Sequence, residues 1–442
     1  NFVRDPAAAA AAAAKNAADA AVAKTAAIPA NTPVDFTRDL PFPDKFMWGA
    51  ATASYQIEGA AEEGGRGPSI WDDFSHTEGK VMNGETGDVA IDHYHRFKED
   101  VALMKQMNLK SYRFSISWSR IMPEGTGEAN QEGIDWYLAL IAELKANDIT
   151  PLITLYHWDL PLALEKGHRG WLGREVVDEF AEYARVCFRA FGDHCANWIT
   201  LNEPWCSAAL GYCNGEHAPG RTQNPGTEPY LAAHHMLLAH AKAVQIYRRE
   251  FKPKQGGVIG ITLNMDWREP ASDSPADIQA AQRSLDFNLG WFADPIYFGD
   301  YPKSMKERAG SRLPSFTIME KALLMGSNDF FGLNHYSTKM SGENQANLKN
   351  VGMWGNEMSG GLWDDESVVL TDGNISPGGA PWVTQDMGWN VVPWGLRKLL
   401  LYISKRYHPK GGIIITENGC AVGDEEVASF EPVEGATRGG KG

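Results

Sequence analysis

The chain has 442 residues, of which 43% are hydrophobic and 22% are charged, so it can bury a large globular core. Its formal net charge is −15, with a sequence pI of about 5.3. Nucleic acids and anionic membranes bind basic surfaces, so this charge argues against both as partners. No apolar run reaches transmembrane length, and no CxxC or HExxH spacing indicates a metal site.

The cysteine pattern bears on the compartment. The five cysteines are Cys187, Cys195, Cys206, Cys213 and Cys420. Their odd number and irregular spacing predict free thiols in a reducing environment. We therefore expect a cytoplasmic protein, and a processed secreted form stays open as the alternative. The oligomeric state cannot be read from these features.

Residues 1–35 form an Ala-rich tail that contains an unbroken run from Ala7 to Ala14. Alanine is the best helix former, but a uniform alanine face has little to bury. We assign no role to this tail. Residues 36–442 show no linker between two domains and are expected to form a single domain.

From Phe46 onward, β-prone runs alternate with helical patterns. Apolar residues recur every three or four positions over 91–107 and 176–191, which predicts two amphipathic helices. Several β-prone runs lack polar alternation, which is typical of parallel strands buried on both faces. The predicted strands are 46–57, 111–118, 150–157, 197–202, 257–264, 329–336 and 412–416.

This βα alternation fits either a doubly wound sheet or a closed (β/α)8 barrel. No GxGxxG follows the first strand and no GxxxxGK[ST] occurs, so the sequence lacks the motifs expected of the common nucleotide-binding open sheets. We therefore predict an α/β fold of the TIM-barrel type. The Gly-rich stretch 341–380 is interpreted as a long loop, because β-prone runs of one kind lie on both sides of it.

Polar residues stand at or near the ends of all seven predicted strands. The active site of a (β/α)8 barrel lies at the carboxyl ends of its strands, so we expect these side chains to converge. They are Gln56, Glu58, Arg113, His157, Trp158, Asp159, Asn202, Glu203, Asn264, Asn334, His335, Tyr336, Glu417 and Asn418.

Two carboxylates far apart in the sequence, Glu203 and Glu417, suggest glycosidic-bond chemistry. That reaction needs a proton donor for the leaving oxygen and a carboxylate for the sugar carbon, about 5 Å apart in a retaining enzyme. Arg113 would keep one carboxylate ionised, and Tyr336 would orient it. Structural explanations stay open: Arg113 as a buried ion-pair partner and His157 as a core histidine.

Several motifs resemble those of glycoside hydrolase family 1 β-glucosidases. Two hold the carboxylates, Thr200-Leu201-Asn202-Glu203-Pro204 and Ile415-Thr416-Glu417-Asn418-Gly419. The resemblance extends from about residue 42 to residue 422, in family order. The other matching segments are 46–59, Tyr112-Arg113-Phe114-Ser115-Ile116-Ser117-Trp118, His157-Trp158-Asp159-Leu160-Pro161 and Asn334-His335-Tyr336.

The resemblance implies a catalytic (β/α)8 barrel that hydrolyses β-glucosides with retention, without a metal or other cofactor. Glu203 is similar to the family's acid/base, and Glu417 to its nucleophile. The substrate-binding residues implied by the resemblance are Gln56, His157, Asn202, Trp158 and, by a looser match, the aglycone platform Trp382. The residues implied around the nucleophile are Arg113, Asn334 and Tyr336.

The C-terminus departs from the family pattern. Only residues 418–442 follow Glu417, whereas the family continues with a helix and an eighth strand. We therefore expect this sequence to be C-terminally incomplete, and a protein that ended at Gly442 to have very weak or no glucosidase activity.

The lead hypothesis is a retaining β-glucosidase that acts on cellobiose, short cello-oligosaccharides and aryl or alkyl β-glucosides. A non-catalytic sugar-binding or structural protein of the same fold is the alternative. A 6-phospho-β-glucosidase or β-galactosidase specificity also stays open.

Overall fold

A computed structural model describes residues 42, 46–345, 350–351, 357–358, 360–374 and 381–422. The predicted Ala-rich tail and residues 423–442 lie outside the described residues. The parts that carry the predicted strands and the predicted site are described.

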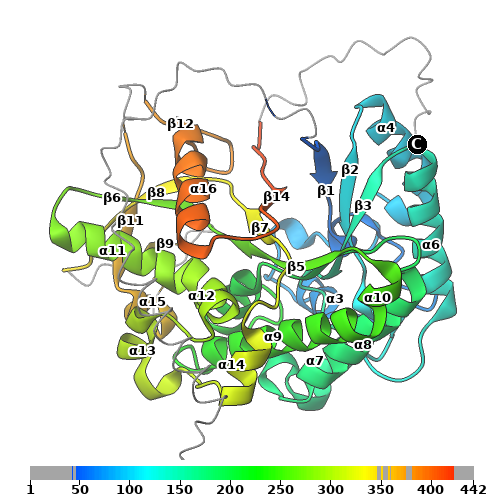
Figure 1. The fold of residues 1–442 in the computed structure, drawn as a ribbon, viewed down its shortest axis with the longest axis horizontal. Helices are drawn as coiled ribbons and strands as arrows, with labels where there is room; N and C mark the ends of the chain where they lie inside the picture. The colour runs from blue at the N-terminus through cyan, green and yellow to red at the C-terminus, as the bar shows by residue number, and fades with distance from the viewer. Residues whose placement is uncertain are drawn as a thin grey trace, which may run out of the picture.

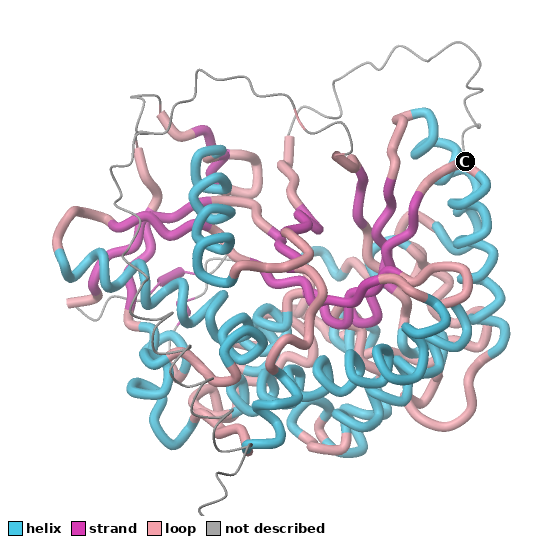
Figure 2. Tube along the Cα trace, viewed as in Figure 1, coloured by secondary structure: helices cyan, strands magenta, loops and turns pink. Residues whose placement is uncertain are grey.

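The centre of the fold is a seven-stranded parallel sheet of order β1-β2-β3-β4-β5-β7-β14. Figure 2 shows these strands in the middle of the molecule with helices packed around them. The predicted parallel α/β alternation is therefore confirmed. The strands are β1 (Gly49–Ala51), β2 (Ser111–Ser115), β3 (Thr150–Tyr156), β4 (Asn197–Asn202), β5 (Val258–Asn264), β7 (Phe331–Asn334) and β14 (Ile413–Glu417).

Helices connect successive strands of this sheet, as Figure 1 shows. Both helices predicted from apolar periodicity are found, as α4 and α8. The longer helices are α4 (His93–Gln106), α6 (Gln131–Ala146), α8 (Val176–Phe191), α9 (Glu228–Ile246), α11 (Pro275–Leu285), α12 (Trp291–Phe298) and α16 (Pro393–Tyr407). The shorter ones are α2 (Ser54–Ile57), α3 (Ile70–Ser75), α5 (Trp118–Ile121), α7 (Leu162–His168), α10 (Lys252–Gln255), α13 (Lys303–Ala309), α14 (Ile318–Leu324) and α15 (Leu362–Glu366).

Small strand pairings outside the central sheet and irregular helical turns complete the described chain. The remaining strands are β6 (Trp267–Pro270), β8 (Thr338–Glu343), β9 (Asn350–Val351), β10 (Glu357–Met358), β11 (Val368–Thr371), β12 (Val383–Thr384) and β13 (Asn390–Val391). The 3₁₀ turns are η1 (Met82–Gly84), η2 (Gly170–Leu172) and η6 (Gly310–Arg312), and the π turns are η3 (Cys206–Leu210), η4 (Tyr247–Phe251) and η5 (Asp286–Gly290).

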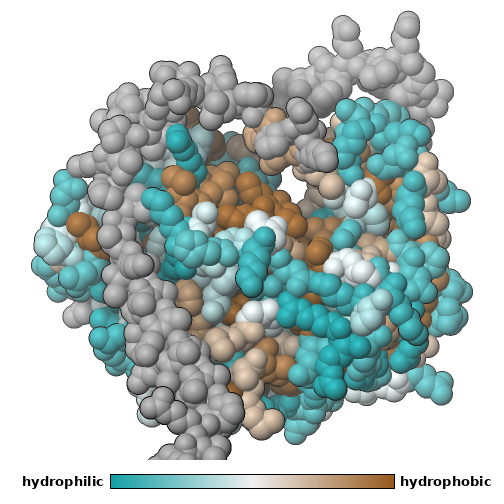
Figure 3. Space-filling view, viewed as in Figure 1, coloured by the Kyte–Doolittle hydropathy of each residue, from teal (hydrophilic) through white to brown (hydrophobic). Residues whose placement is uncertain are grey.

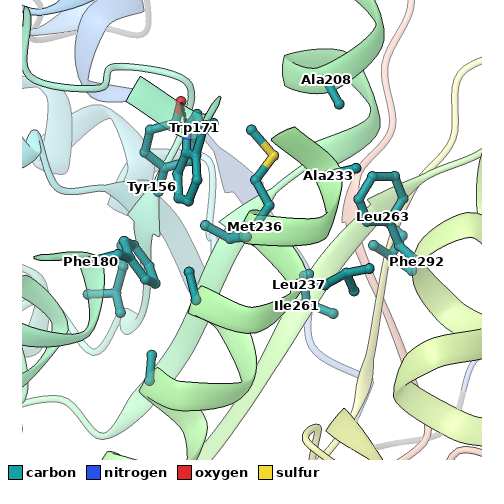
Figure 4. Packing of buried hydrophobic residues seen from close by; sticks show 14 of the residues in the cluster. Tyr156, Trp171, Phe180, Ala208, Ala233, Met236, Leu237, Ile261, Leu263 and Phe292 are labelled. Atoms are coloured by element: carbon teal, nitrogen blue, oxygen red, sulfur yellow. Dashed lines mark hydrogen bonds between the residues drawn. The ribbon is translucent and has the colours of Figure 1, made fainter. Parts of the chain in front are cut away.

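The core lies between the sheet and its helices, and α9 is buried on nearly every side. Figure 4 shows Met236 of α9 on the side of Tyr156 and Trp171, and Leu237 on the side of Ile261 and Phe292. An apolar helix of this kind fixes the strands β3, β4 and β5 relative to one another. The carboxyl ends of these strands are thereby held in place.

The first predicted strand, 46–57, is wrong in its second half. Pairing with β2 ends at Ala51, and Ser54–Ile57 forms the helical turn α2. The backbone N–H of Glu58 donates to the carbonyl of Ser54, so the local hydrogen bonds are helical. Gly59 then takes a left-handed φ of 65°, which stops the turn and which glycine adopts at little cost.

The long loop predicted over 341–380 is also wrong in its described part. This part includes the end of β8, the helix α15 and the strand β11. Val368, Val369, Leu370 and Thr371 pair antiparallel with β8, which also pairs with β6 to give a three-stranded sheet. The high glycine content of this stretch led to the loop prediction, although the stretch also contains the short β-branched run of β11, which pairs with β8.

The described sheet ends at β1 on one side and at β14 on the other. Figure 3 shows the surface hollowed between the positions of these two strands, with apolar side chains gathered beside the opening. Trp48, just before β1, is 56% exposed, and Ile415 of β14 is 40% exposed. The sheet is therefore a nearly closed barrel in the described residues.

Candidate active site

Both predicted carboxylates lie at the carboxyl ends of sheet strands. Glu203 directly follows β4, and Glu417 is the last residue of β14. At Glu203 the backbone leaves the sheet with a φ of 45°, while its N–H still donates to the carbonyl of Thr262 at 2.9 Å. Pro204 has no N–H to continue the ladder. The π turn η3 begins at Cys206, so Glu203 is held between a strand and a helix.

Glu417 is held by two charge-assisted hydrogen bonds. Nη1 of Arg113, on β2, donates to its Oε1 at 2.5 Å, and the hydroxyl of Tyr336 donates to its Oε2 at 2.6 Å. Arg113 is buried, and its Nε also donates to the hydroxyl of Thr154 at 3.0 Å. Both carboxylate oxygens therefore have fixed donors.

A chain of hydrogen bonds joins the two glutamates. Nη2 of Arg113 donates to Oδ1 of Asn202 at 2.6 Å, and the amide of Asn334 donates to the same oxygen at 3.1 Å. The Asn334 amide also donates to Oε1 of Glu203 at 2.7 Å. Arg113 of β2, Asn202 of β4 and Asn334 of β7 thus connect Glu417 to Glu203, although these three strands are not neighbours in the sheet.

The two carboxyl groups have pKa values shifted in opposite directions. Burial raises the pKa of Glu203, and the negative charge of Glu417 raises it further. Burial also acts to raise the pKa of Glu417, but the guanidinium of Arg113 and the Tyr336 hydroxyl outweigh it, so that pKa is lowered. The pair therefore favours one protonated and one ionised carboxyl group near neutral pH.

His157 and Trp158 lie next to this network at the end of β3. Nε2 of His157 is 3.0 Å from the amide nitrogen of Asn202, and burial lowers the pKa of His157 to about 4. The ring is therefore neutral, and with Nε2 accepting it carries its proton on Nδ1. That Nδ1 is buried and has no hydrogen-bond partner among the described residues.

Trp158 is positioned by a strained backbone. It has a φ of 77°, and its indole N–H donates to the carbonyl of Asn202 at 3.0 Å. Its ring lies 5.2 Å from that of His157 and 4.9 Å from that of His217. A bulky residue with positive φ is uncommon and is held here by its surroundings.

Two predicted site residues are not joined to this network in the described structure. Gln56 lies on α2, is exposed, and has no side-chain hydrogen bond to another described residue. Trp382 is half-buried with its ring 5.9 Å from that of Trp394 and beside Gly373. The roles of both stay predictions.

Several residues of the site were not predicted. The thiol of Cys206 donates to Oε2 of Glu203 at 3.4 Å, and Thr416 donates to Oδ1 of Asn334 at 2.7 Å. The ring of Trp389 lies 5.4 Å from that of Tyr336. Of these residues, only Cys206 could have been predicted from the sequence. A helical turn after Pro204 places it one turn from Glu203.

Within the described ranges, no group of three or more His, Cys, Asp or Glu side chains is placed to hold a metal ion. The same part of the chain contains no helix of sufficient length and apolarity to span a bilayer. All five cysteines are free thiols, and all but Cys420 are buried.

Comparison with known proteins identifies the family. The sequence profile described as "Glycosyl hydrolase family 1" matches residues 38–438. The chain belongs to glycosyl hydrolase family 1. It is 47% identical to Beta-glucosidase 34 of Oryza sativa over 400 residues, covering 88% of this chain and 77% of the relative. It is 48% identical to Beta-glucosidase 42 of Arabidopsis thaliana over 399 residues, covering 88% and 78% of the two chains.

Solved structures agree with this assignment. The rice Os3BGlu6 β-glucosidase superposes with a TM-score of 0.80 at 47% identity, covering 86% of this chain and 80% of that one. A family 1 β-glucosidase from the fungus Humicola insolens, solved in complex with glucose, gives 0.79 at 45% identity with the same coverage. The predicted TIM-barrel-like fold, the family and the assignment as a β-glucosidase-type glycosyl hydrolase are confirmed.

Proposed function

We propose that the protein is a retaining β-glucosidase in which Glu203 is the acid/base and Glu417 is the nucleophile. The observation that carries this proposal is the pair of strand-end glutamates joined by one hydrogen-bond chain, with pKa values shifted in opposite directions. A mutant of the rice Os3BGlu6 enzyme was solved in a covalent complex with Glc, which supports a glycosyl-enzyme route here.

In the first step, protonated Glu203 donates its proton to the glycosidic oxygen while Glu417 attacks the anomeric carbon. The bond to the aglycone breaks, the aglycone leaves as an alcohol, and an ester forms between Glu417 and the sugar. In the second step, Glu203 takes a proton from water, which attacks the anomeric carbon and releases Glu417. Two inversions give net retention.

The environment of each residue suits its role. Glu417 must be ionised to attack, and Arg113 and Tyr336 favour its charged form. Glu203 must hold a proton at neutral pH, and its burial beside a second carboxylate favours the neutral form. When Glu417 becomes an ester its charge is lost, so the pKa of Glu203 falls as it changes from acid to base.

We propose that His157, Asn202, Trp158 and Gln56 bind the glucosyl unit. The unpartnered Nδ1–H of His157 and the buried amide of Asn202 are neutral donors suited to sugar hydroxyls. Trp382 is proposed as an aglycone platform. Proposed substrates are cellobiose, short cello-oligosaccharides, and aryl and alkyl β-glucosides.

Variants of the two glutamates test this proposal. Glu417→Ala should lower kcat/KM on an aryl β-glucoside by at least about 10³-fold, because no other group can form the ester. Exposed Glu99 on α4 supplies the control variant Glu99→Ala, which should keep parental activity. A 2-deoxy-2-fluoroglucoside should label the parent protein, and peptide mapping should find the adduct on Glu417. Full activity of Glu417→Ala, or an adduct elsewhere, would overturn the assignment.

Specificity is tested by comparing kcat/KM on β-glucosides, β-galactosides and 6-phospho-β-glucosides that share one aglycone. The proposal expects the highest value with the glucoside. A higher kcat/KM with the galactoside or the phosphorylated sugar would contradict the proposed glucoside preference and assign that other specificity.

We also propose a cytoplasmic location, which the five unpaired cysteines support. Fractionation of the source cells with an antibody to this chain tests it, and recovery from the secreted fraction would contradict it.

A further inference from the structure

The thiol of Cys206 lies beside the oxygen of Glu203 that the polar network leaves uncovered. Glu203 has two carboxyl oxygens, and the Asn334 amide donates to Oε1 at 2.7 Å. The amide nitrogen is a donor only, so Oε1 acts as an acceptor and the proton belongs on Oε2. Among the described residues, the hydrogen-bond partner of Oε2 is the Cys206 thiol, at 3.4 Å.

The backbone fixes this thiol relative to the carboxyl group. The N–H of Cys206 donates to the carbonyl of Glu203 at 2.9 Å, which closes the turn that leads into η3. Glu203 and Cys206 are both buried. The contact therefore follows from the turn itself and does not depend on a long, mobile side chain.

We propose that Cys206 is a positioning residue for the acid/base, whose weak thiol donor fixes Oε2 of Glu203 while leaving that oxygen able to carry and release a proton. This inference rests on the proposed role of Glu203. A thiol is a weak donor, so it orients the carboxyl group without strongly favouring its ionised form. Burial raises the pKa of the Cys206 thiol, and the charge of Glu203 raises it further, so the thiol stays protonated and can donate.

The test separates positioning of the acid from support of the fold. Cys206→Ala removes the donor. With a phenyl or alkyl β-glucoside, whose leaving group needs a proton, kcat/KM should fall about fivefold, a small part of the 10²–10⁴-fold that an acid supplies. With 2,4-dinitrophenyl β-glucoside, whose leaving group needs no proton, kcat/KM should stay at the parental value.

The pH profile gives a second readout. The thiol hydrogen bond acts to lower the pKa of Glu203, so its loss should move the alkaline limb of kcat/KM to higher pH. Cys206→Ser restores a donor and should move the limb back toward the parental position and recover phenyl glucoside activity. Cys213 offers the matched control, because its buried thiol donates to the carbonyl of Pro225 at 3.5 Å, so Cys213→Ala should change neither readout.

Glu203→Gln, assayed on the same two substrates, keeps the two proposals distinguishable. If Glu203→Gln loses activity only on the poor leaving group while Cys206→Ala behaves as the parent, the inference fails and the proposed function stands. An equal loss on both substrates with Cys206→Ala, with an unmoved alkaline limb, also overturns the inference. If Glu203→Gln shows no dependence on the leaving group, the acid/base assignment and the inference both fail.

Discussion

The two glutamates differ in what surrounds each carboxyl group. Glu417 accepts hydrogen bonds from a guanidinium and a phenol, whereas Glu203 accepts from a neutral amide and a thiol. Donors to a carboxylate favour its ionised form, and burial without a cation favours its neutral form. The opposite pKa shifts of two identical side chains therefore follow from their neighbours, and they support the proposed division of roles.

Tyr336→Phe tests how Glu417 is kept ionised. The Tyr336 hydroxyl favours the carboxylate form, so its removal should raise the pKa of Glu417. The acid limb of kcat/KM should then move to higher pH, and kcat/KM at neutral pH should fall about 10- to 100-fold. Tyr301→Phe removes another buried phenol hydroxyl, whose contact is with His234, and should leave the limb unchanged. An unmoved acid limb in Tyr336→Phe would contradict this account.

Asp159 gives a stability prediction that depends on pH. Burial raises the pKa of Asp159 to about 6, and its Oδ1 has no partner among the described residues. Because the folded pKa lies above the unfolded one, ionisation of Asp159 penalises the fold. The penalty grows from about pH 4 to about pH 6 and is constant above that range.

Asp159→Asn should remove this penalty, since the amide is neutral and its oxygen can still accept from Ser54, whose hydroxyl now donates at 2.7 Å. We expect the free energy of unfolding to rise by about 1–3 kcal/mol at pH 7 relative to the parent. The gain should shrink at pH 4, as measured by urea unfolding at both values. A gain of equal size at both values would show that the charge is not its cause.

The start of the strand β5 requires a backbone conformation that few residues adopt. Gly257, immediately before β5, has a φ of 77°, and an added Cβ would collide with the carbonyl oxygen of Ala196. That carbonyl accepts from the N–H of Val258 at 3.0 Å, where β4 and β5 begin to pair. Glycine at this position thus allows β4 and β5 to approach each other closely where their pairing begins.

Gly257→Ala should lower the free energy of unfolding by about 2–3 kcal/mol, because both the backbone conformation and the space exclude a methyl group. Gly167 of α7 is the control, since an added Cβ there meets nothing within 4 Å. Gly167→Ala should instead stabilise by about 0.5–1 kcal/mol, since it lies in a helix. Equal effects in denaturant unfolding would contradict the structural distinction.

Across the described sheet, the inner strands are paired on both sides and the two end strands on one side. β3, β4 and β5 are each paired on both sides, and α6 packs on β3 while α9 packs on β4 and β5, whereas β1 and β14 form the two ends. An end strand exposes backbone groups and side chains that a central strand buries. The exposure of Trp48 and Ile415 follows from this arrangement.

Hydrogen–deuterium exchange should therefore show a gradient across the sheet. Amides of β3, β4, β5 and α9 should exchange slowest, and those of β1 and β14 fastest, because local opening costs less at an end strand. Mass spectrometry of peptic peptides measures this. Protection of β1 and β14 equal to that of β4 would contradict the prediction and show that further backbone covers both ends.

From the sequence alone, the parallel α/β architecture and two candidate reacting groups could be predicted. Apolar runs without polar alternation predicted buried parallel strands, and strand-ending polar residues predicted Glu203 and Glu417. These signals are local, because a strand's burial and its end are encoded in adjacent residues. The limits of the local signal appear at Gln56, whose segment was predicted as strand and folds as the turn α2.

The difference between the two glutamates, in contrast, arises only in the folded molecule. The Arg113–Asn202–Asn334 chain of hydrogen bonds and the thiol of Cys206 on Glu203 depend on side-chain directions at several strand ends. Burial and neighbouring charge, which set each pKa, are properties of the folded molecule and not of a motif. For this reason the two carboxylates can be predicted from the sequence, whereas the folded barrel makes Glu203 favour its protonated form and Glu417 its ionised form.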